Sequence, residues 1–206
     1  MIFRIQGMLI DAAAGAVIFI PLFSILSGWL LKNRNRTGKI FYMMFAVYLT
    51  AVFSATGIPW FRTVNADLSV NLIPFADIFN SPVDYIKNSL LNIVLFIPAG
   101  MFLPLLWKEF QNFKKTAVFG FGLSLVIEVL QIFTFRLSDV DDLITNTLGS
   151  MIGYVIANQL FYVLNGKLTA ERGNCRRELP FLAGVVFLVC FTVQPYLAEY
   201  FWGMFL

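Results

Sequence analysis

The sequence predicts an all-α, polytopic integral membrane protein: a bundle of about five to six transmembrane helices with an interfacial or re-entrant outer loop. Composition is the first reason. Hydrophobic residues make up 59% of the 206 residues and charged residues only 13%, whereas soluble domains average about 45–50% apolar and about 25% charged. A chain this short cannot bury so much apolar surface in one water-soluble core. We therefore expect residues 1–206 to form a single transmembrane domain.

Apolar stretches of spanning length are the second reason, because a transmembrane helix needs about 20 mostly apolar residues. The last of these stretches contains Pro195 and Glu199, so we expect it to bend or to end early. The candidate spans, in chain order, are residues 8–31, 40–60, 88–107, 114–134, 143–164 and 180–204.

Basic residues predict how these spans are oriented. Of the 15 Lys and Arg residues, eleven fall in three connecting segments on one side of the predicted bundle: Lys32, Arg34, Arg36, Lys39, Lys108, Lys114, Lys115, Lys167, Arg172, Arg176 and Arg177. Positive residues favour the cytoplasmic side. The basic loops are then cytoplasmic, while both termini and the loops 61–87 and 135–142 are extracytoplasmic. Because topology explains these basic loops, we expect no nucleic-acid partner.

Polar residues inside two of the predicted spans indicate an interior-facing site. Glu128 and Gln131 are three residues apart and share one helix face, as do Asn88 and Asn92 in the preceding span. An acidic side chain deep in a spanning helix costs about 2.5–3.5 kcal/mol on insertion scales, so it normally faces a bundle interior or a wet cavity. We expect both faces to point into the same interior.

The predicted fifth span adds a third polar face. Asp142, Asn146, Gly149 and Gly153 recur at spacings of four, three and four, and the two glycines form a GxxxG pair that allows close helix approach. Three helices would then direct polar groups into one outward-opening pocket. Arg136, at the end of the fourth span, would be the local cation for Glu128, an aspartate or an anionic ligand.

The predicted outer loop contains the stretch NLIPF, which runs from Asn71 to Phe75. It is too apolar for bulk water and too short to span a membrane. An interfacial or re-entrant segment that covers the pocket fits this composition better than a solvated connector does.

Each feature also has a plainer explanation. Asp141 or Asp142 would serve as a helix N-cap, and GxxxG is most often a packing motif. Glu128 and Arg136 would form a structural ion pair. The sequence identifies no cofactor; the alternative is a divalent cation held by Glu128 and the aspartates of the short turn, although a bare DxDD is a weak signal. Histidine is absent from the chain, which removes histidine-ligated metals and histidine-based catalysis.

The order and spacing of these segments resemble the VanZ-like family of small membrane proteins. The resemblance covers about residues 40–160, and residues 165–206, a basic loop plus an extra C-terminal span, lie outside it. The matching stretches are NLIPF (71–75), NIVLFIPAGMFLPLL (92–106) and SLVIEVLQIFTFRLSDVDDLITNTLGSMIGY (124–154). The family's namesake is associated with resistance to teicoplanin, a lipid-tailed glycopeptide that acts on the outside of Gram-positive bacteria. The resemblance thus implies a cell-envelope compartment and leaves the mechanism open.

Two functional hypotheses follow. In the first, the protein lowers susceptibility to lipoglycopeptides by binding a lipoglycopeptide, a membrane lipid or a lipid-linked cell-wall intermediate. Arg136 would contact anionic headgroups, the loop with Asn71 and Phe75 would gate access, and the hydrogen-bonding residues would be Asn92, Glu128, Gln131 and Asn146.

In the second hypothesis the protein is an intramembrane enzyme that modifies a lipid or a lipid-linked precursor. Glu128 would be the general acid or base, and Asp139 and Asp142 would hold a divalent ion or transfer a second proton. Arg136 would stabilise a phosphate oxygen. A transporter has less support because the chain shows no repeat symmetry, and assembly into a homo-oligomer stays an open alternative.

Overall fold

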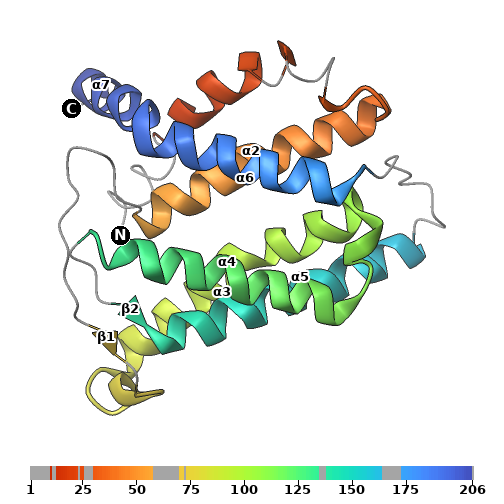
Figure 1. Cartoon of the computed structure of the whole chain (residues 1–206). Helices are drawn as coiled ribbons and strands as arrows, with labels where there is room; N and C mark the ends of the chain where they lie inside the picture. Colours follow the sequence, from red (N-terminus) through yellow and green to blue (C-terminus); the bar gives the residue numbers. More distant parts are fainter. Residues whose placement is uncertain are drawn as a thin grey trace. The chain divides into compact units, whose positions relative to one another are not determined.

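A computed structural model describes residues 10, 13–22, 24–25, 30–57, 70–71, 73–134, 138–163 and 173–205 of the chain (Figure 1). These residues are almost entirely helical, which confirms the predicted all-α class. They cluster into two compact units, one made by Met1–Val64 with Ala170–Leu206 and the other by Asn65–Thr169. We describe each unit separately.

The described part of the first unit includes helices α2 (Arg36–Thr56), α6 (Cys175–Thr192) and α7 (Gln194–Phe205). A shorter apolar helix, Ala13–Leu22, precedes them. The side chain of Asn35 caps α2 by accepting a hydrogen bond from Gly38 N at 2.8 Å. The helix ends at Gly57, whose left-handed φ of 72° suits a residue without a Cβ.

A buried ion pair joins α6 to the segment before α2. The Arg34 guanidinium donates to Glu178 Oε2 at 2.7 Å, and the two side chains are 1% and 6% exposed. Tyr42 on α2 donates its hydroxyl to the Glu178 carbonyl at 2.9 Å. The sequence predicts only a topological role for Arg34 and none for Glu178. The structure instead places both in the interior of this unit, as partners.

The second unit is built around α3 (Pro82–Leu106), α4 (Phe113–Gln131) and α5 (Val140–Val163). Helix α5 packs along both α3 and α4 (Figure 1). Where α3 and α5 meet, a Cβ added to Gly149 would collide with the carbonyl oxygen of Ile93, and one added to Gly153 with that of Ile97. The GxxxG pair therefore brings α5 against the α3 backbone, as the sequence predicted.

Helix α3 begins earlier than the sequence predicted. Its first residue is Pro82, which fits the N1 position because the missing N–H would have no helical partner there. Residues 82–87, which were expected to be loop, are helical. Short 3₁₀ helices flank α3: η1 (Ala76–Ile78) precedes it and η2 (Lys108–Phe110) follows it.

This unit also contains a short parallel strand pair that was not predicted from the sequence. β1 (Val70–Asn71) pairs with β2 (Ser138–Asp139), with Val70 opposite Ser138 and Asn71 opposite Asp139. Strands of two residues carry too little periodicity to be recognised in a sequence. This pair ties the segment before α3 to the start of α5.

Two described helices, α2 and α3, are long and apolar enough to cross a membrane, and the bent pair α6–α7 raises the number to three if it forms one span. The pair bends by 46°, beside the Pro195 that was expected to interrupt this span. The expected count of five to six spans is not confirmed by this criterion. One reason is composition: Lys114, Lys115 and Glu128 lie within α4, and the Asn, Gln, Thr and Gly residues of α5 lower its mean hydropathy.

Candidate functional site

The candidate site begins where α4 ends and α5 starts. Glu128, in the last turns of α4, is buried. Its Oε2 accepts a hydrogen bond from the backbone N–H of Asp139 at 3.0 Å, and its carbonyl accepts one from Ser138 Oγ at 2.7 Å. Glu128 also lies within electrostatic range of Asp139 and Asp142. The buried carboxylate is thus attached to strand β2 and to the first turn of α5.

Asp139 also starts α5. Its Oδ1 accepts a hydrogen bond from the backbone N–H of Asp141 at 2.9 Å, which satisfies one of the free N–H groups at the helix start. The sequence analysis offered Asp141 or Asp142 as the capping residue. The structure shows Asp139 in that role, while Asp141 and Asp142 contact other segments.

Those two carboxylates reach other segments of the unit. Asp142 Oδ1 accepts a hydrogen bond from Asn92 Nδ2 of α3 at 2.6 Å. Asp141 accepts the backbone N–H of Phe75 with both oxygens, at 2.9 and 3.1 Å. Asp142 therefore connects α5 to α3, and Asp141 connects α5 to the NLIPF segment.

The NLIPF segment is fixed at two points. Asn71 Nδ2 donates to Asp139 Oδ2 at 3.4 Å, and Asn71 Oδ1 accepts the backbone N–H of Ile73 at 3.2 Å. Phe75 has a φ of 63°, a left-handed conformation that is uncommon for a bulky residue. Its hydrogen bonds to Asp141 compensate for this backbone conformation.

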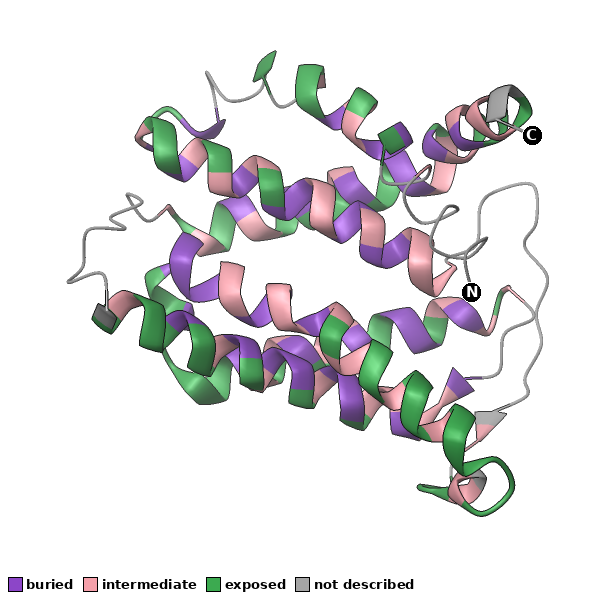
Figure 2. Cartoon of the chain, turned by 180° about the vertical axis from the view of Figure 1, so that it is seen from behind, coloured by how far each residue is buried: buried purple, intermediate pink, exposed green. Residues whose placement is uncertain are grey.

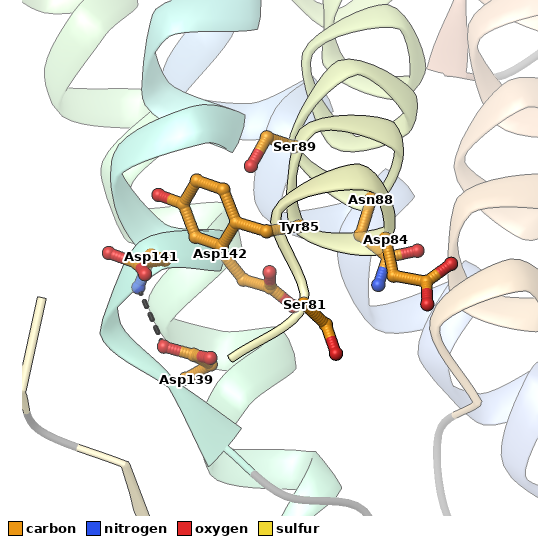
Figure 3. A pocket seen from close by; sticks show the side chains of 8 residues that line it. All are labelled: Ser81, Asp84, Tyr85, Asn88, Ser89, Asp139, Asp141 and Asp142. Atoms are coloured by element: carbon orange, nitrogen blue, oxygen red, sulfur yellow. Dashed lines mark hydrogen bonds between the residues drawn. The ribbon is translucent and has the colours of Figure 1, made fainter. Parts of the chain in front are cut away.

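A pocket of about 320 Å³ lies between the start of α3 and the start of α5. The ring of Tyr85 extends from α3 toward Asp141 and Ser89 (Figure 3). The lining is polar and rich in hydrogen-bond acceptors. It consists of Ser81, Asp84, Tyr85, Asn88, Ser89, Asp139, Asp141 and Asp142.

The structure places the predicted residues in three groups. Asp139 and Asp142 line the pocket, and Glu128, Asn92, Asn71 and Phe75 contact the aspartates at its wall. Asn146 and Gln131 are buried away from the lining, where Asn146 Nδ2 donates to Ser124 Oγ at 2.9 Å. Arg136 lies outside the described residues.

Four lining residues at the start of α3 were absent from the predicted site, namely Ser81, Asp84, Tyr85 and Ser89, whereas Asn88 was predicted to face the interior. A signal for them was present in the sequence: Ser81, Asp84, Tyr85 and Asn88 recur with helical spacing. Because the predicted helix starts at residue 88, this periodicity falls in an expected loop. Recognising Pro82 as a first helical residue would have recovered them.

The pocket lining contains several carboxylate, hydroxyl and amide oxygens. Within the described segments, no group of three or more His, Cys, Asp or Glu side chains is placed to hold a metal ion. The expected alternative of a divalent cation therefore gains no support from these residues.

The long apolar helices place the chain in the class of helical membrane proteins. Residues 39–162 match the VanZ/LLP1 family model, so the chain belongs to the VanZ/LLP1 family. It is 37% identical over 86 residues to Protein VanZ of Enterococcus faecium. That match covers 41% of this chain and 50% of the relative, so the chain spans about half the length of the curated relative it matches. No solved structure matches the chain.

The family match confirms the recognition made from the sequence. The predicted boundaries, about residues 40–160, agree closely with the matched residues 39–162. The match includes the carboxylates of the pocket wall and the α3 residues that line it. Of the described helices, α6 and α7 follow the matched region.

Proposed function

We propose that this VanZ/LLP1-family membrane protein binds the polar head of an amphiphile in the pocket between α3 and α5, and that this binding lowers susceptibility to lipid-tailed glycopeptides such as teicoplanin. The observation that carries the proposal is the pocket itself. It combines acidic and hydroxyl side chains with an adjoining exposed apolar surface. An amphiphile needs both kinds of contact at once.

The lining favours a head rich in hydrogen-bond donors. Asp84, Asp139, Asp141 and Asp142 present acceptor oxygens, which suit ammonium, sugar hydroxyl or peptide amide groups. The ring of Tyr85 adds an aromatic wall that attracts a cation. A phosphate in the same head would need a separate cation, the role that we propose for Arg136.

The apolar surface suits the tail or the surrounding lipid. Phe79 is 90% exposed and Val83 77%, and Ile73, Phe75 and Ile86 are also more than half exposed. Figure 2 shows this exposed surface along the start of α3 and the turn before it. Side chains this apolar belong in the interfacial layer of a bilayer. The NLIPF segment, attached to Asp141, would then sit at the level of the lipid headgroups and gate the pocket.

We also propose that α4 and α5 cross the membrane, as the sequence analysis expected. At 1.5 Å per residue, their 19 and 24 residues span about 28 and about 36 Å, close to the roughly 30 Å hydrocarbon core. On α4, exposed residues such as Val118 and Leu125 are apolar, while Ser124 and Glu128 are buried. This pattern suits a helix with lipid outside and polar partners inside.

By the distribution of basic residues, the pocket would face the extracytoplasmic side. Labelling with an impermeant thiol reagent tests this orientation. Val140→Cys, in a protein whose Cys175 and Cys190 are replaced, should be labelled in intact cells. Labelling only after the cells are opened would place the pocket in the cytoplasm and would contradict the proposed compartment.

The proposed function is tested by expressing the protein in a sensitive host. We expect protection against teicoplanin and much less against vancomycin, a glycopeptide without the lipid tail. A variant that removes two of the four pocket carboxylates, Asp84→Asn with Asp142→Asn, should lose most of the protection at equal membrane abundance. Equal protection against both drugs, or none against either, would contradict recognition of a drug tail.

The enzyme hypothesis has one observation of its own. Glu128 is a buried carboxyl group attached to Asp139 and within electrostatic range of Asp142, an arrangement suited to proton transfer. If it acts as acid or base, Glu128→Gln should abolish protection while the variant keeps its abundance and thermal stability. A Glu128→Gln protein with full protection would exclude chemistry through this residue and leave the binding function in place.

A further inference from the structure

Two polar atoms in the interior of the second unit have no hydrogen-bonding partner within the described part of the chain. They are Asn146 Oδ1 and Ser150 Oγ, and their residues are only 3% and 0% exposed. Buried polar groups are nearly always hydrogen-bonded, and each exception calls for an explanation such as a bound water or ion. Neither residue belongs to the pocket lining.

The two atoms share a small site between α4 and α5. Asn146 and Ser150 are four residues apart and therefore lie on one face of α5. The Ser150 side chain faces Gly120 of α4, because a Cβ added to Gly120 would collide with Ser150 Oγ. One turn further along α4, Ser124 Oγ accepts the Asn146 amide at 2.9 Å. We call the site formed by Gly120, Ser124, Asn146 and Ser150 the Ser150 cradle.

We propose that the Ser150 cradle binds a water molecule inside the helix bundle. Water both donates and accepts, and buried waters typically make about three hydrogen bonds to groups that would otherwise be unsatisfied. It would donate one hydrogen to Asn146 Oδ1 and pair with the Ser150 hydroxyl. The cradle has neutral side chains, whereas Ca²⁺ or Mg²⁺ takes about six or more oxygen ligands, commonly including carboxylates. Water therefore fits the donor set better than a cation does.

The water would extend the pocket's polar surface into the bundle. Asp142, which lines the pocket, Asn146 and Ser150 follow one another at four-residue intervals along α5. At 1.5 Å per residue, the line covers about 12 Å. Hydration then reaches two helical turns below the pocket, on the face of α5 that contacts Ser124 of α4. This inference does not depend on which ligand the pocket binds.

Radiolytic footprinting tests the site directly, because hydroxyl radicals generated from a bound water oxidise adjacent side chains. Phe96 of α3 packs against Gly149, which precedes Ser150 in the sequence, and Phe96 is 0% exposed. Phe45 on α2 is equally buried and serves as the control. We expect Phe96 to be oxidised several-fold faster than Phe45 in the wild-type protein. Equal rates would overturn the proposal.

Ser150→Ala provides the second measurement, with Thr147→Val as the matched control. The Thr147 hydroxyl already donates to the Leu143 carbonyl at 2.7 Å, so its removal should leave Phe96 oxidation unchanged. If water occupies the cradle, Ser150→Ala removes one of its partners, slows Phe96 oxidation to the Phe45 rate and lowers Tm by about 2 °C. In a dry cradle, Ser150→Ala would instead remove an unsatisfied polar group and raise Tm. A raised Tm overturns the proposal.

Discussion

Buried or partly buried carboxylates are held differently in the two units. In the first unit Glu178 meets the guanidinium of Arg34 at 2.7 Å, so its charge is cancelled where it lies. In the second unit Glu128, Asp139, Asp141 and Asp142 accept hydrogen bonds from amide N–H groups. An amide donor stabilises a carboxylate without neutralising it.

This difference separates a structural site from a candidate binding site. A cancelled charge holds two segments together and has little field left for a ligand. Carboxylates that line a pocket present acceptor oxygens toward it, and the donors of a ligand can use these oxygens. We therefore expect a carboxylate-to-amide substitution to damage the stability of the first unit and the ligand binding of the second, and the predictions below test this contrast.

The largest expected effect is that of Glu178→Gln. The substitution leaves the Arg34 guanidinium buried without its counter-charge, and breaking a buried pair in this way typically costs about 3–5 kcal/mol. Thermal unfolding in detergent should show a strongly lowered Tm. The double variant Arg34→Met with Glu178→Leu removes both charges and should recover most of the loss. If the double variant were no more stable than Glu178→Gln, the loss would not come from an unpaired charge.

The next-largest loss of stability is expected from disturbing the packing that brings the pocket residues of α3 and α5 together. A Cβ on Gly153 would collide with the carbonyl oxygen of Ile97 and approach the Gly100 Cα at 3.0 Å. We expect Gly153→Ala to lower the free energy of unfolding by about 3 kcal/mol, near the upper end for overpacking. Gly122→Ala on α4 is the control, because nothing lies within 4 Å of its added Cβ. Equal Tm values for the two variants would show that α3 and α5 are not in close contact.

These two sites show what the sequence could reveal. Gly149 and Gly153 form a motif of fixed spacing, so the approach of α3 and α5 was predictable. Arg34 and Glu178 lie 144 residues apart, and no local pattern marks them as partners. Both lie close in sequence to other charged residues, so membrane topology was enough to explain why these charges are present. Pairing across such a sequence separation becomes visible only in three dimensions.

The sequence likewise indicated some residues of the candidate site and not others. Asp139 and Asp142 stood out because charge is expensive near a spanning helix, and both line the pocket. Asp84 and Tyr85 were not predicted, because polar residues are common in solvent-exposed loops and the sequence indicated a loop at these positions. The role of Asp141, which holds the Phe75 backbone, depends on a left-handed turn that the side-chain pattern does not encode.

A smaller loss of stability is expected where a carboxylate accepts a hydrogen bond from a backbone N–H group and does not pair with a cation. Asp141→Ala removes both acceptors of the Phe75 N–H, and hydrogen bonds to charged groups contribute about 1.5–3 kcal/mol. We expect a loss of about 1.5 kcal/mol, because the NLIPF segment is largely exposed and water replaces part of the bond. Limited proteolysis within residues 73–80 should become faster, while the rest of the chain keeps its protection. Unchanged cleavage would mean that Asp141 does not hold the segment.

The smallest stability effect is expected for Asp142→Asn, the direct counterpart of Glu178→Gln. Its side-chain oxygen can still accept the Asn92 amide, a bond of 2.6 Å in the wild-type protein, and one negative charge leaves a cluster of carboxylates. The free energy of unfolding should therefore change by less than about 0.5 kcal/mol.

Ligand binding should respond in the opposite way to Asp142→Asn. Losing a charged acceptor in the pocket costs about 1.5 kcal/mol of binding, which is roughly a tenfold higher Kd. Binding of a fluorescent lipoglycopeptide to the purified protein measures this, with Glu178→Gln at a temperature where it remains folded as the comparison. If Asp142→Asn lost as much Tm as Glu178→Gln and bound the probe as tightly as wild type, Asp142 would be a structural residue. The amide-bound carboxylates would then serve the same purpose as the ion pair, and the distinction between the two units would fail.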